Sequence, residues 1–420
     1  MIFSKKVFYG WIVVICCIIL MALGIGMFNS TNSMFVIPVC ESLGFSRAQF
    51  TFYRSIVILI GALVMPLYGR IIQRFGVKKV LAAGALMLGF SAFGYSTSNN
   101  LWQFYLFASV NGLFYNGINF MSIGVLINAW FKGRKGLATG LAFSGSGLGG
   151  AVMIPVIGHM IELIGWRWAY RFMGVFGIAV MLPIIIIFIK NEPTDIGLDP
   201  LALEQSGQKS RPLTVVSYSF REAIRSLKFW LLVTAFFFLN FFATAINSHT
   251  APYLSDLGYM TPYIASVLSL YMVSLTMGKI FLGSIYDRFG AMAGNVFVSA
   301  FCLGFPIFAY LSYIPAMAWI YAVFVGIASC GVTVPVSILV IRYFGDKEFP
   351  VIFSFVMMFS NLAPVFSLPA MGAVYDFTGT YKPAWIVFFF CSAIITACFI
   401  AVEILGKRDA YYSRSPGAAS

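Results

Sequence analysis

The stretch that decides the fold is residues 261–290, TPYIASVLSLYMVSLTMGKIFLGSIYDRFG. It is apolar over a length sufficient for an α-helix to cross a bilayer, which takes about 20 residues. One charged residue, Lys279, lies deep inside the apolar run, and the run ends in the polar turn GSIYDRFG at residues 283–290. Because a lysine within hydrocarbon costs roughly 2.5–3.5 kcal/mol on insertion scales, such a residue indicates a functional site.

The composition extends this interpretation to the whole chain. Of the 420 residues, 60% are hydrophobic and only 10% are charged, whereas a soluble protein has roughly 25% charged residues. The net charge of +13 is spread between apolar runs, which favours a lipid bilayer as the partner and argues against nucleic acid. The seven cysteines form no C-x-x-C pair, so we interpret them as packing residues and expect no metal site and no cofactor.

Twelve apolar segments are long enough to span a membrane. They lie near residues 9–29, 50–71, 80–95, 102–128, 136–160, 168–189, 229–253, 263–285, 291–311, 317–341, 351–371 and 385–405. When their loops are assigned alternately to the two sides, all but six of the 27 lysines and arginines fall on one side. The six others are Arg47, Arg54, Arg167, Arg171, Lys279 and Lys382. Positively charged loops face the cytoplasm, so both termini are predicted to be cytoplasmic, with the chain in the inner (plasma) membrane.

The two halves of the chain repeat. A shift of 214 residues lays GRIIQRFG at 69–76 over GSIYDRFG at 283–290, and the same shift aligns Pro155 with Pro369. Parallel repeats of six spans imply a pseudo-two-fold axis along the membrane normal, with a substrate site near the midplane. We therefore predict an all-α membrane protein of twelve transmembrane helices in two six-helix, pseudo-symmetric bundles. The expected parts are an N-terminal bundle (1–190), a cytoplasmic linker with a short helix near 218–226 (191–228), a C-terminal bundle (229–406) and a cytoplasmic tail (407–420).

The spans, the linker and the two G-x-x-x-[DQ]-R-x-G turns resemble the major facilitator superfamily over nearly the whole chain. Four further motifs resemble its monocarboxylate and oxalate–formate transporter branch. They are Tyr9-Gly-Trp11, WFKGRKGLATG at 130–140, Gly165-Trp-Arg167 and His249-x-x-Pro-Tyr-x-x-Asp256-Leu-Gly258. The resemblance implies that a basic residue in span eight binds the substrate carboxylate, and Lys279 occupies that place. The branch more often has arginine there, and Leu275 stands where mammalian members carry an acidic residue.

Lys279 has two ordinary explanations besides ligand binding. A lysine that snorkels to the cytoplasmic headgroups would have to reach the level of Asp287, eight residues and roughly 12 Å of helix away. A structural ion pair would need a carboxylate at the same depth, and all 14 acidic residues are expected near the ends of spans, in loops or in the tail. The sequence therefore favours a small organic anion as the ligand. A desolvated lysine releases a proton more readily than an arginine, which allows proton coupling through Lys279.

Other polar residues inside the spans are candidates to line the substrate cavity. We predict this role for Asn29, Tyr115, Asn116, Asn119, Thr333, Ser360 and Asn361. The alternative for each is a hydrogen bond to a neighbouring helix, which is an equally common use of an intramembrane amide. Asn116 comes first because the resemblance places a substrate-contacting residue there. Asn361 comes next because Pro364 predicts a loosened helix with free backbone groups.

Charged residues at the ends of spans predict conformational roles. His249 and Asp256 are candidates for a proton-sensing or gating pair at the outer end of span seven, with an interfacial histidine and a loop aspartate as the alternative. Arg54 is expected to pair with an outer-face acid as a gate. In the resembling superfamily the turns that hold Arg74, Asp287 and Arg288 form inter-helix charge contacts, which implies a conformational rather than a substrate-binding motif.

The sequence predicts a transporter, not an enzyme. It has no Ser-His-Asp set, no H-E-x-x-H and no ligand-spaced His/Cys cluster, and the glycine run at 145–150 lies in an apolar span, where close helix packing is its expected use. We expect proton-coupled symport of a small monocarboxylate of the lactate or pyruvate type by a monomer. The alternative is organic anion exchange of the oxalate–formate antiporter type.

Overall fold

The computed structural model describes residues 9–131, 134–197 and 218–412, and these residues are almost entirely helical. The chain forms two compact units, Met1–Leu203 and Glu204–Ser420. In the part of the chain that is described, eleven helices are long and apolar enough to cross a membrane. One of them, α11 (Thr261–Tyr310), is bent at Gly290 into two arms that account for two spans. The prediction of an all-α membrane protein with twelve spans is confirmed.

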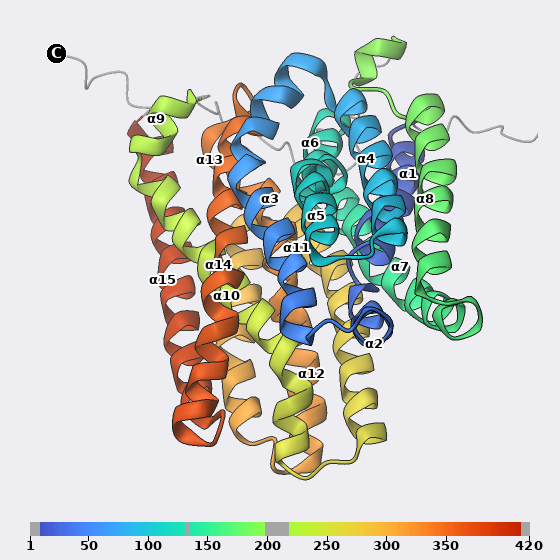
Figure 1. The fold of residues 1–420 in the computed structure, drawn as a ribbon. Helices are drawn as coiled ribbons and strands as arrows, with labels where there is room; N and C mark the ends of the chain where they lie inside the picture. The colour runs from blue at the N-terminus through green and yellow to red at the C-terminus, as the bar shows by residue number, and fades with distance from the viewer. Residues whose placement is uncertain (1–8, 132–133, 198–217, 413–420) are drawn as a thin grey trace, which may run out of the picture. The chain divides into compact units, whose positions relative to one another are not determined.

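The first unit contains six spans, coloured blue to green in Figure 1. Its helices are α1 (Tyr9–Met21), which continues as a π-helix (Ala22–Met27), then α2 (Val36–Leu43), α3 (Arg47–Phe75), α4 (Val77–Thr97), α5 (Leu101–Tyr115), α6 (Phe120–Trp130), α7 (Lys135–Ile164) and α8 (Trp166–Phe188). Short 3₁₀ turns lie at Asn32–Phe35 and Asn116–Ile118.

The second unit contains the other six spans. Its helices are α9 (Phe220–Arg225), α10 (Leu227–Asp256), α11, α12 (Pro315–Cys330), α13 (Val334–Phe344), α14 (Phe349–Thr378) and α15 (Lys382–Tyr412). The two turns of the sequence repeat have the same backbone: Gly76 has φ 80° and Gly290 has φ 81°. Only glycine adopts this conformation without strain, so these two glycines set the sharp bends between α3 and α4 and within α11.

The spans predicted near 102–128 and 317–341 are present, but each is interrupted. The fourth span is broken at Asn116–Ile118, between α5 and α6, and the tenth is broken at 331–333, between α12 and α13. The shift of 214 residues superimposes the two breaks, so they belong to the repeated scaffold. In the fourth span the break lets Gly117 approach Gly84 so closely that a Cβ on Gly117 would lie 2.9 Å from the Gly84 Cα.

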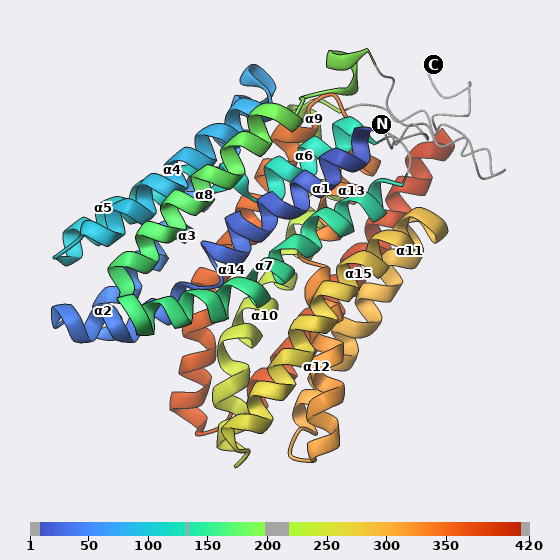
Figure 2. The same cartoon turned by 90° about the vertical axis from the view of Figure 1, so that its right-hand side faces the viewer.

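The glycine run of α7 makes the close helix packing that the sequence predicts, and its partner is the first span. A Cβ on Gly145 would lie 2.2 Å from the Ile18 carbonyl oxygen, and one on Gly149 would lie 2.1 Å from the Ala22 carbonyl oxygen. Figure 2 shows α1 and α7 side by side along this contact. The backbones approach directly because neither position carries a side chain.

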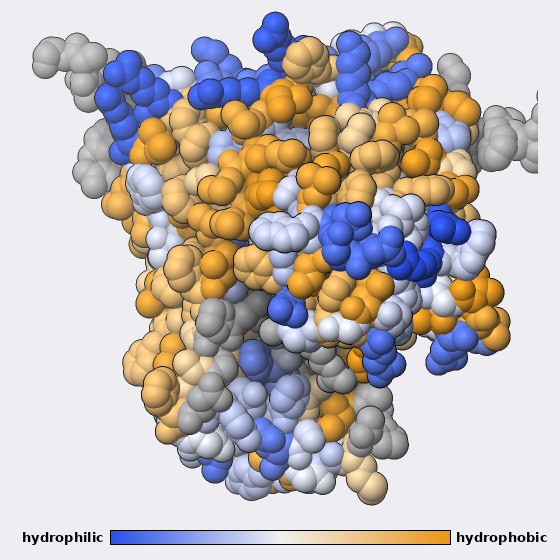
Figure 3. Space-filling model, in the orientation of Figure 1, coloured by the Kyte–Doolittle hydropathy of each residue, from blue (hydrophilic) through white to orange (hydrophobic). Residues whose placement is uncertain are grey.

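The linker predicted between the two bundles is described only at its two ends. A 3₁₀ turn covers Pro193–Ile196, and α9 begins after Ser219 and ends before Ser226, which confirms the short helix predicted near 218–226. The rest of the linker and the end of the tail lie outside the described residues. Figure 3 shows hydrophobic side chains over the flanks of the helices and hydrophilic ones gathered toward helix ends, the distribution expected for spans in a bilayer.

Candidate functional site

Lys279 lies in the first arm of α11 and is buried, with 4% of its surface exposed. Two residues along a helix correspond to roughly 200° of rotation, so Lys279 points away from the face that carries Met277 and Phe281. Those two side chains are 48% and 62% exposed. The charge therefore lies on the protein-facing side of α11, while its neighbours form the apolar outer side.

The surroundings of Lys279 are set by a close contact between α11 and α12. A Cβ on Gly278 would lie 2.6 Å from the Sγ of Cys330, and that thiol donates a hydrogen bond to the Leu275 carbonyl oxygen at 3.1 Å. Cys330 is the last residue of α12. Lys279 is thus held at the level where the tenth span breaks, the kind of place where transporters bind substrates and ions.

A cavity of about 320 Å³ lies on the other side of this contact. Its lining is apolar and includes Val273, Met277, Phe281, Phe297 and Ile327. Lys279 is not among the lining residues. This hollow therefore belongs to the apolar outer surface of the second unit, and we do not assign the substrate to it.

Three of the polar residues predicted in the first unit, Tyr115, Asn116 and Asn119, lie at the break of the fourth span. The Asn116 amide donates to the Gly61 carbonyl oxygen at 2.6 Å, and the Asn119 side chain accepts from the Phe120 N–H at 2.7 Å. Tyr115 is half-buried beside them. The first two contacts join helices and cap α6, which is the alternative use that the sequence left open for these amides.

The polar residues predicted in the second unit are near Lys279 or on α14. Thr333 donates to the Cys330 carbonyl oxygen at 3.5 Å, and Ser360 donates to the Phe236 carbonyl oxygen at 3.1 Å. Asn361 is half-buried on α14. The predicted loosening of the helix at Pro364 is wrong, because α14 runs unbroken from Phe349 to Thr378.

The reason α14 stays intact is a side chain from α10. Proline has no N–H, so Pro364 leaves the carbonyl oxygen one turn earlier, that of Ser360, without its helical donor. The Asn240 amide donates to this Ser360 oxygen at 2.9 Å. A neighbouring helix thereby supplies the missing hydrogen bond, which is how prolines are tolerated in membrane helices.

The two candidates for a proton-sensing or gating pair at the end of α10 lie apart. The His249 Nδ1 lies 3.4 Å from the Tyr381 hydroxyl, whereas Asp256 is exposed at the last residue of the helix. No hydrogen bond or ion pair joins the two within the described residues. The separation follows from geometry, since seven residues correspond to roughly 10 Å along a helix.

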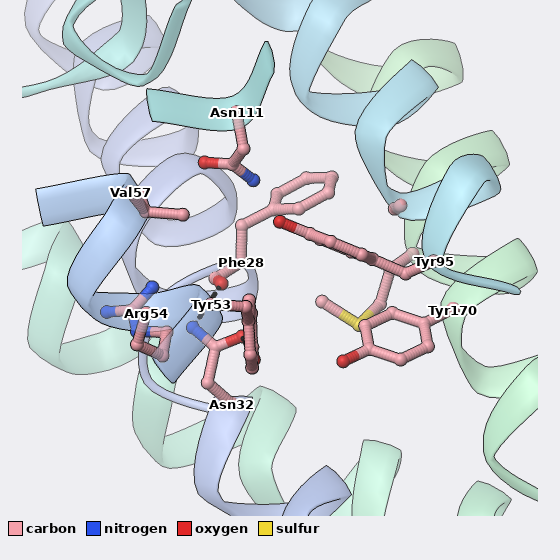
Figure 4. A pocket seen from close by; sticks show the side chains of 10 residues that line it. Phe28, Asn32, Tyr53, Arg54, Val57, Tyr95, Asn111 and Tyr170 are labelled. Carbon is pink, nitrogen blue, oxygen red and sulfur yellow. Dashed lines mark hydrogen bonds between the residues drawn. The ribbon is translucent and has the colours of Figure 1, made fainter. Parts of the chain in front are cut away.

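Arg54 has a different partner from the one predicted. Its guanidinium donates to the side-chain oxygen of Asn29, and among the residues described it makes no ion pair with an acid. It borders a small pocket with Tyr53, Tyr95 and Tyr170, shown in Figure 4. Sequence reasoning missed the tyrosines because they come from three helices far apart in the chain and form no motif.

The conformational motif lies at the exposed ends of its helices. Arg74, Asp287 and Arg288 are all exposed, and the Arg74 guanidinium lies 5.4 Å from the Phe75 ring centroid. A separate inter-helix ion pair joins Arg342 of α13 to Glu403 of α15 at 3.2 Å. Nowhere in the described ranges do three or more His, Cys, Asp or Glu residues gather as metal ligands.

The arrangement of spans matches solved transporters. The structure of FucP, the fucose:proton symporter of E. coli, aligns with a TM-score of 0.70 over 94% of this chain and 99% of FucP, at 13% sequence identity. At that identity the likeness concerns the fold alone. The family model described as Major Facilitator Superfamily matches residues 14–325. The chain therefore belongs to the Major Facilitator Superfamily, and it is a membrane transporter rather than an enzyme.

Two similar sequences have names that specify carboxylates. The oxalate:formate antiporter of Oxalobacter formigenes is 28% identical over 286 residues, 67% of this chain and 64% of the antiporter. Monocarboxylate transporter 12 of Xenopus laevis is 25% identical over 294 residues, 67% of this chain and 63% of that protein. Each match spans slightly less than two thirds of the relative's own length.

Proposed function

We propose that this protein is a proton-coupled symporter of a small monocarboxylate such as lactate or pyruvate, with Lys279 as the substrate-binding cation. The observation that carries the proposal is the burial of Lys279 at the level of the broken tenth span. A cation enclosed in an apolar span favours an anionic substrate. The names of the two relatives point to the carboxylate class of anions.

Proton coupling follows from the choice of lysine. When water is excluded, an amine gives up its proton more readily than a guanidinium does. In the proposed cycle a proton and a carboxylate arrive together, and both leave when the ammonium–carboxylate pair separates. The charges of one proton and one monocarboxylate cancel, so transport is electroneutral.

The remaining assignments complete the proposal. Residues at the end of the first span, at the two breaks and on α14 serve as further candidates for contacting the substrate: Asn29, Tyr115, Asn116, Asn119, Thr333, Ser360 and Asn361. The protein lies in the inner (plasma) membrane as a monomer with both termini in the cytoplasm, as the distribution of basic residues supports.

A second candidate function is anion exchange. It is favoured by the likeness to the oxalate:formate antiporter. The two functions differ in what drives uptake. Symport of a monocarboxylate is stimulated by an inward proton gradient, whereas exchange requires a carboxylate on the opposite side of the membrane.

The test is uptake of radiolabelled lactate, pyruvate, acetate, formate and oxalate into proteoliposomes, each with and without an inward proton gradient. We expect gradient-stimulated uptake of a monocarboxylate that is lost in Lys279→Met. Lys279→Arg keeps the charge but not the ready release of a proton, so it should bind the anion yet lose the stimulation. Undiminished uptake by Lys279→Met would overturn the proposal, and uptake that needs a trans anion would establish exchange.

A matched control is available in the same unit. Lys228 is also buried, with 7% of its surface exposed, but it lies in the first turn of α10, where its ammonium contacts the Tyr218 hydroxyl at 3.3 Å. Lys228→Met removes a buried lysine from a helix end and should leave uptake within about twofold of the unmodified protein. An equal loss in both variants would mean that removal of a lysine disturbs folding.

A further inference from the structure

We propose that the first unit holds an anion site of its own, a pocket beside Arg54 that binds one small monovalent anion of halide size. The pocket lies between the end of the first span and helices α3, α4, α5 and α8. It belongs entirely to the first unit, whereas Lys279 belongs to the second. The inference goes beyond the transport proposal and does not depend on it.

Two buried hydroxyl groups mark the position of the ligand. Tyr95 and Tyr170 are 4% and 1% exposed, and their hydroxyl oxygens make no hydrogen bond with the part of the chain that the structure describes. Figure 4 shows both hydroxyls directed into the pocket from the α4 and α8 side. Since nearly all buried hydroxyls have a partner, a bound ligand is the natural partner for this pair.

The charge of the pocket selects an anion. Arg54 lines the pocket from α3, on the side opposite Tyr95 and Tyr170, and the Asn111 amide points toward the pocket from α5. Two nearby side-chain oxygens that would suit a cation are already engaged: Asn29 accepts from Arg54, and Asn32 accepts from the Tyr53 hydroxyl at 3.1 Å. The nearest acids in the sequence, Glu41 and Glu162, are exposed at the surface. What remains is a set of hydrogen-bond donors beside a positive charge.

The size of the pocket limits the ligand. Its volume of about 10 Å³ is roughly the space that one water-sized ligand requires. A chloride or bromide ion fits this description, formate is the smallest carboxylate worth testing, and lactate is too large. A neutral water would fill the same space, so the experiment must separate an anion from a water.

The test is thermal unfolding of the purified full-length protein in detergent, at constant ionic strength, while sodium gluconate is replaced by sodium bromide, chloride or formate. Gluconate is too large to enter the pocket. We expect a saturable rise in melting temperature with bromide and chloride. The titration is repeated in Lys279→Met, so that a rise caused by anion binding at Lys279 is recognised by its disappearance there.

Two variants tie the effect to the pocket. In the double variant Tyr95→Phe/Tyr170→Phe the anion concentration for half-maximal stabilisation should rise at least tenfold, and in Arg54→Gln the stabilisation should vanish. A purely structural role of these groups would shift the melting temperature equally in gluconate and bromide. Thr139→Val is the matched control, because Thr139 is a buried hydroxyl without a partner in the described chain but lies outside the pocket.

Three results would overturn the proposal. They are no stabilisation by halide beyond that of gluconate, stabilisation that survives unchanged in the tyrosine double variant, and stabilisation that Thr139→Val removes to the same degree. The first two would assign the pocket to water. Crystals grown in bromide give an independent measurement, since an anomalous peak within hydrogen-bond distance of the Tyr95 and Tyr170 hydroxyls is expected only if the anion binds there.

Discussion

The helix pairs α1/α7 and α10/α14 occupy equivalent places in the two units, yet they are held together by different chemistry. In the first pair the backbones touch at Gly145 and Gly149. In the second pair the repeat puts Phe359 and Ala363 at those positions. The contact there is made by aromatic rings, such as those of Trp230 and Phe359, whose centroids are 5.7 Å apart. Two hydrogen bonds add to it: the Asn240 amide donates to the Ser360 carbonyl oxygen, and the Ser360 hydroxyl donates to the Phe236 carbonyl oxygen.

The comparison separates what the repeat preserves from what each unit adds. The breaks of the fourth and tenth spans and the turns at Gly76 and Gly290 are common to both units. The cations that we assign to ligands are not: the shift of 214 residues puts Arg54 on Leu268 and Lys279 on Met65. The scaffold is therefore shared, while the charges that we assign to ligands are individual to each unit.

The largest effect is expected when the charge of the second unit is moved to the equivalent place in the first. Met65→Lys in the Lys279→Met background should not restore uptake, which stays roughly 100-fold or more below the unmodified protein, as expected for loss of a buried charge pair with substrate. Met65 is fully buried, so the new lysine should also lower the melting temperature. Proteoliposome uptake and thermal unfolding measure the two effects. Restored uptake would show that a lysine in the first unit can replace Lys279, and that substrate binding is not specific to the second unit.

The next largest effect concerns the glycine contact. Gly149→Ala places a Cβ 2.1 Å from the Ala22 carbonyl oxygen, which forces the helices apart and should cost about 1–3 kcal/mol of stability. The reciprocal change in the second unit, Ala363→Gly, removes a methyl group from a contact that already accommodates it. Its expected cost is about 1 kcal/mol, mainly from helix propensity. Unfolding in mixed micelles compares the two, and equal costs would contradict the difference between the helix pairs.

The fold was predictable because its signals are local. Apolar runs of sufficient length predict spans, and the two glycine turns predict the repeat. Short-range patterns also predicted close helix packing at Gly145–Gly150 and the helix that follows Ser219. The breaks at Asn116 and Thr333 were not predicted, because each run is apolar enough overall to be interpreted as one span, although Gly117 and Asn119 in the first and Gly331 and Pro335 in the second are helix-breaking signals.

The candidate site was predictable only in part. Lys279 stands out in the sequence because charge is rare inside a span. The pocket beside Arg54 does not, because its tyrosines and asparagines converge from separate helices and each is ordinary alone. Pro364 misled the sequence prediction for a similar reason: the side chain that compensates for it, Asn240, lies 124 residues earlier in the chain, on another helix.

A smaller effect tests the polar contact of the second helix pair. Asn240→Ala removes the donor to the Ser360 carbonyl oxygen, and hydrogen bonds between membrane helices contribute about 0.6 kcal/mol on average, with a maximum near 1.7. Pro364→Ala should return the helical N–H to that oxygen, so Asn240→Ala should cost less in this background. A double-mutant cycle of unfolding free energies measures the coupling, and additive costs would mean that Asn240 does not compensate for the proline.

The smallest effect concerns the two ends of the linker, each of which has a capping box. At the start of α9 the Ser219 N–H donates to Glu222 at 2.7 Å, and this hydrogen bond lowers the pKa of the exposed Glu222 carboxyl. Because this pKa is lower in the folded state, the ionised Glu222 carboxylate stabilises α9 fully at pH values above the ordinary glutamate pKa. That stabilisation is lost as the pH falls through the lowered pKa.

Hydrogen–deuterium exchange of residues 220–225, corrected for intrinsic rates, should therefore quicken slightly below about pH 4.5. Glu222→Gln keeps the capping geometry without titrating, so its exchange should lack this pH dependence. If exchange in the variant also quickens at low pH, another group causes the change. The charge of Glu222 would then not make α9, at the start of the second unit, differ from the capped 3₁₀ turn at Pro193–Ile196, where the described part of the first unit ends.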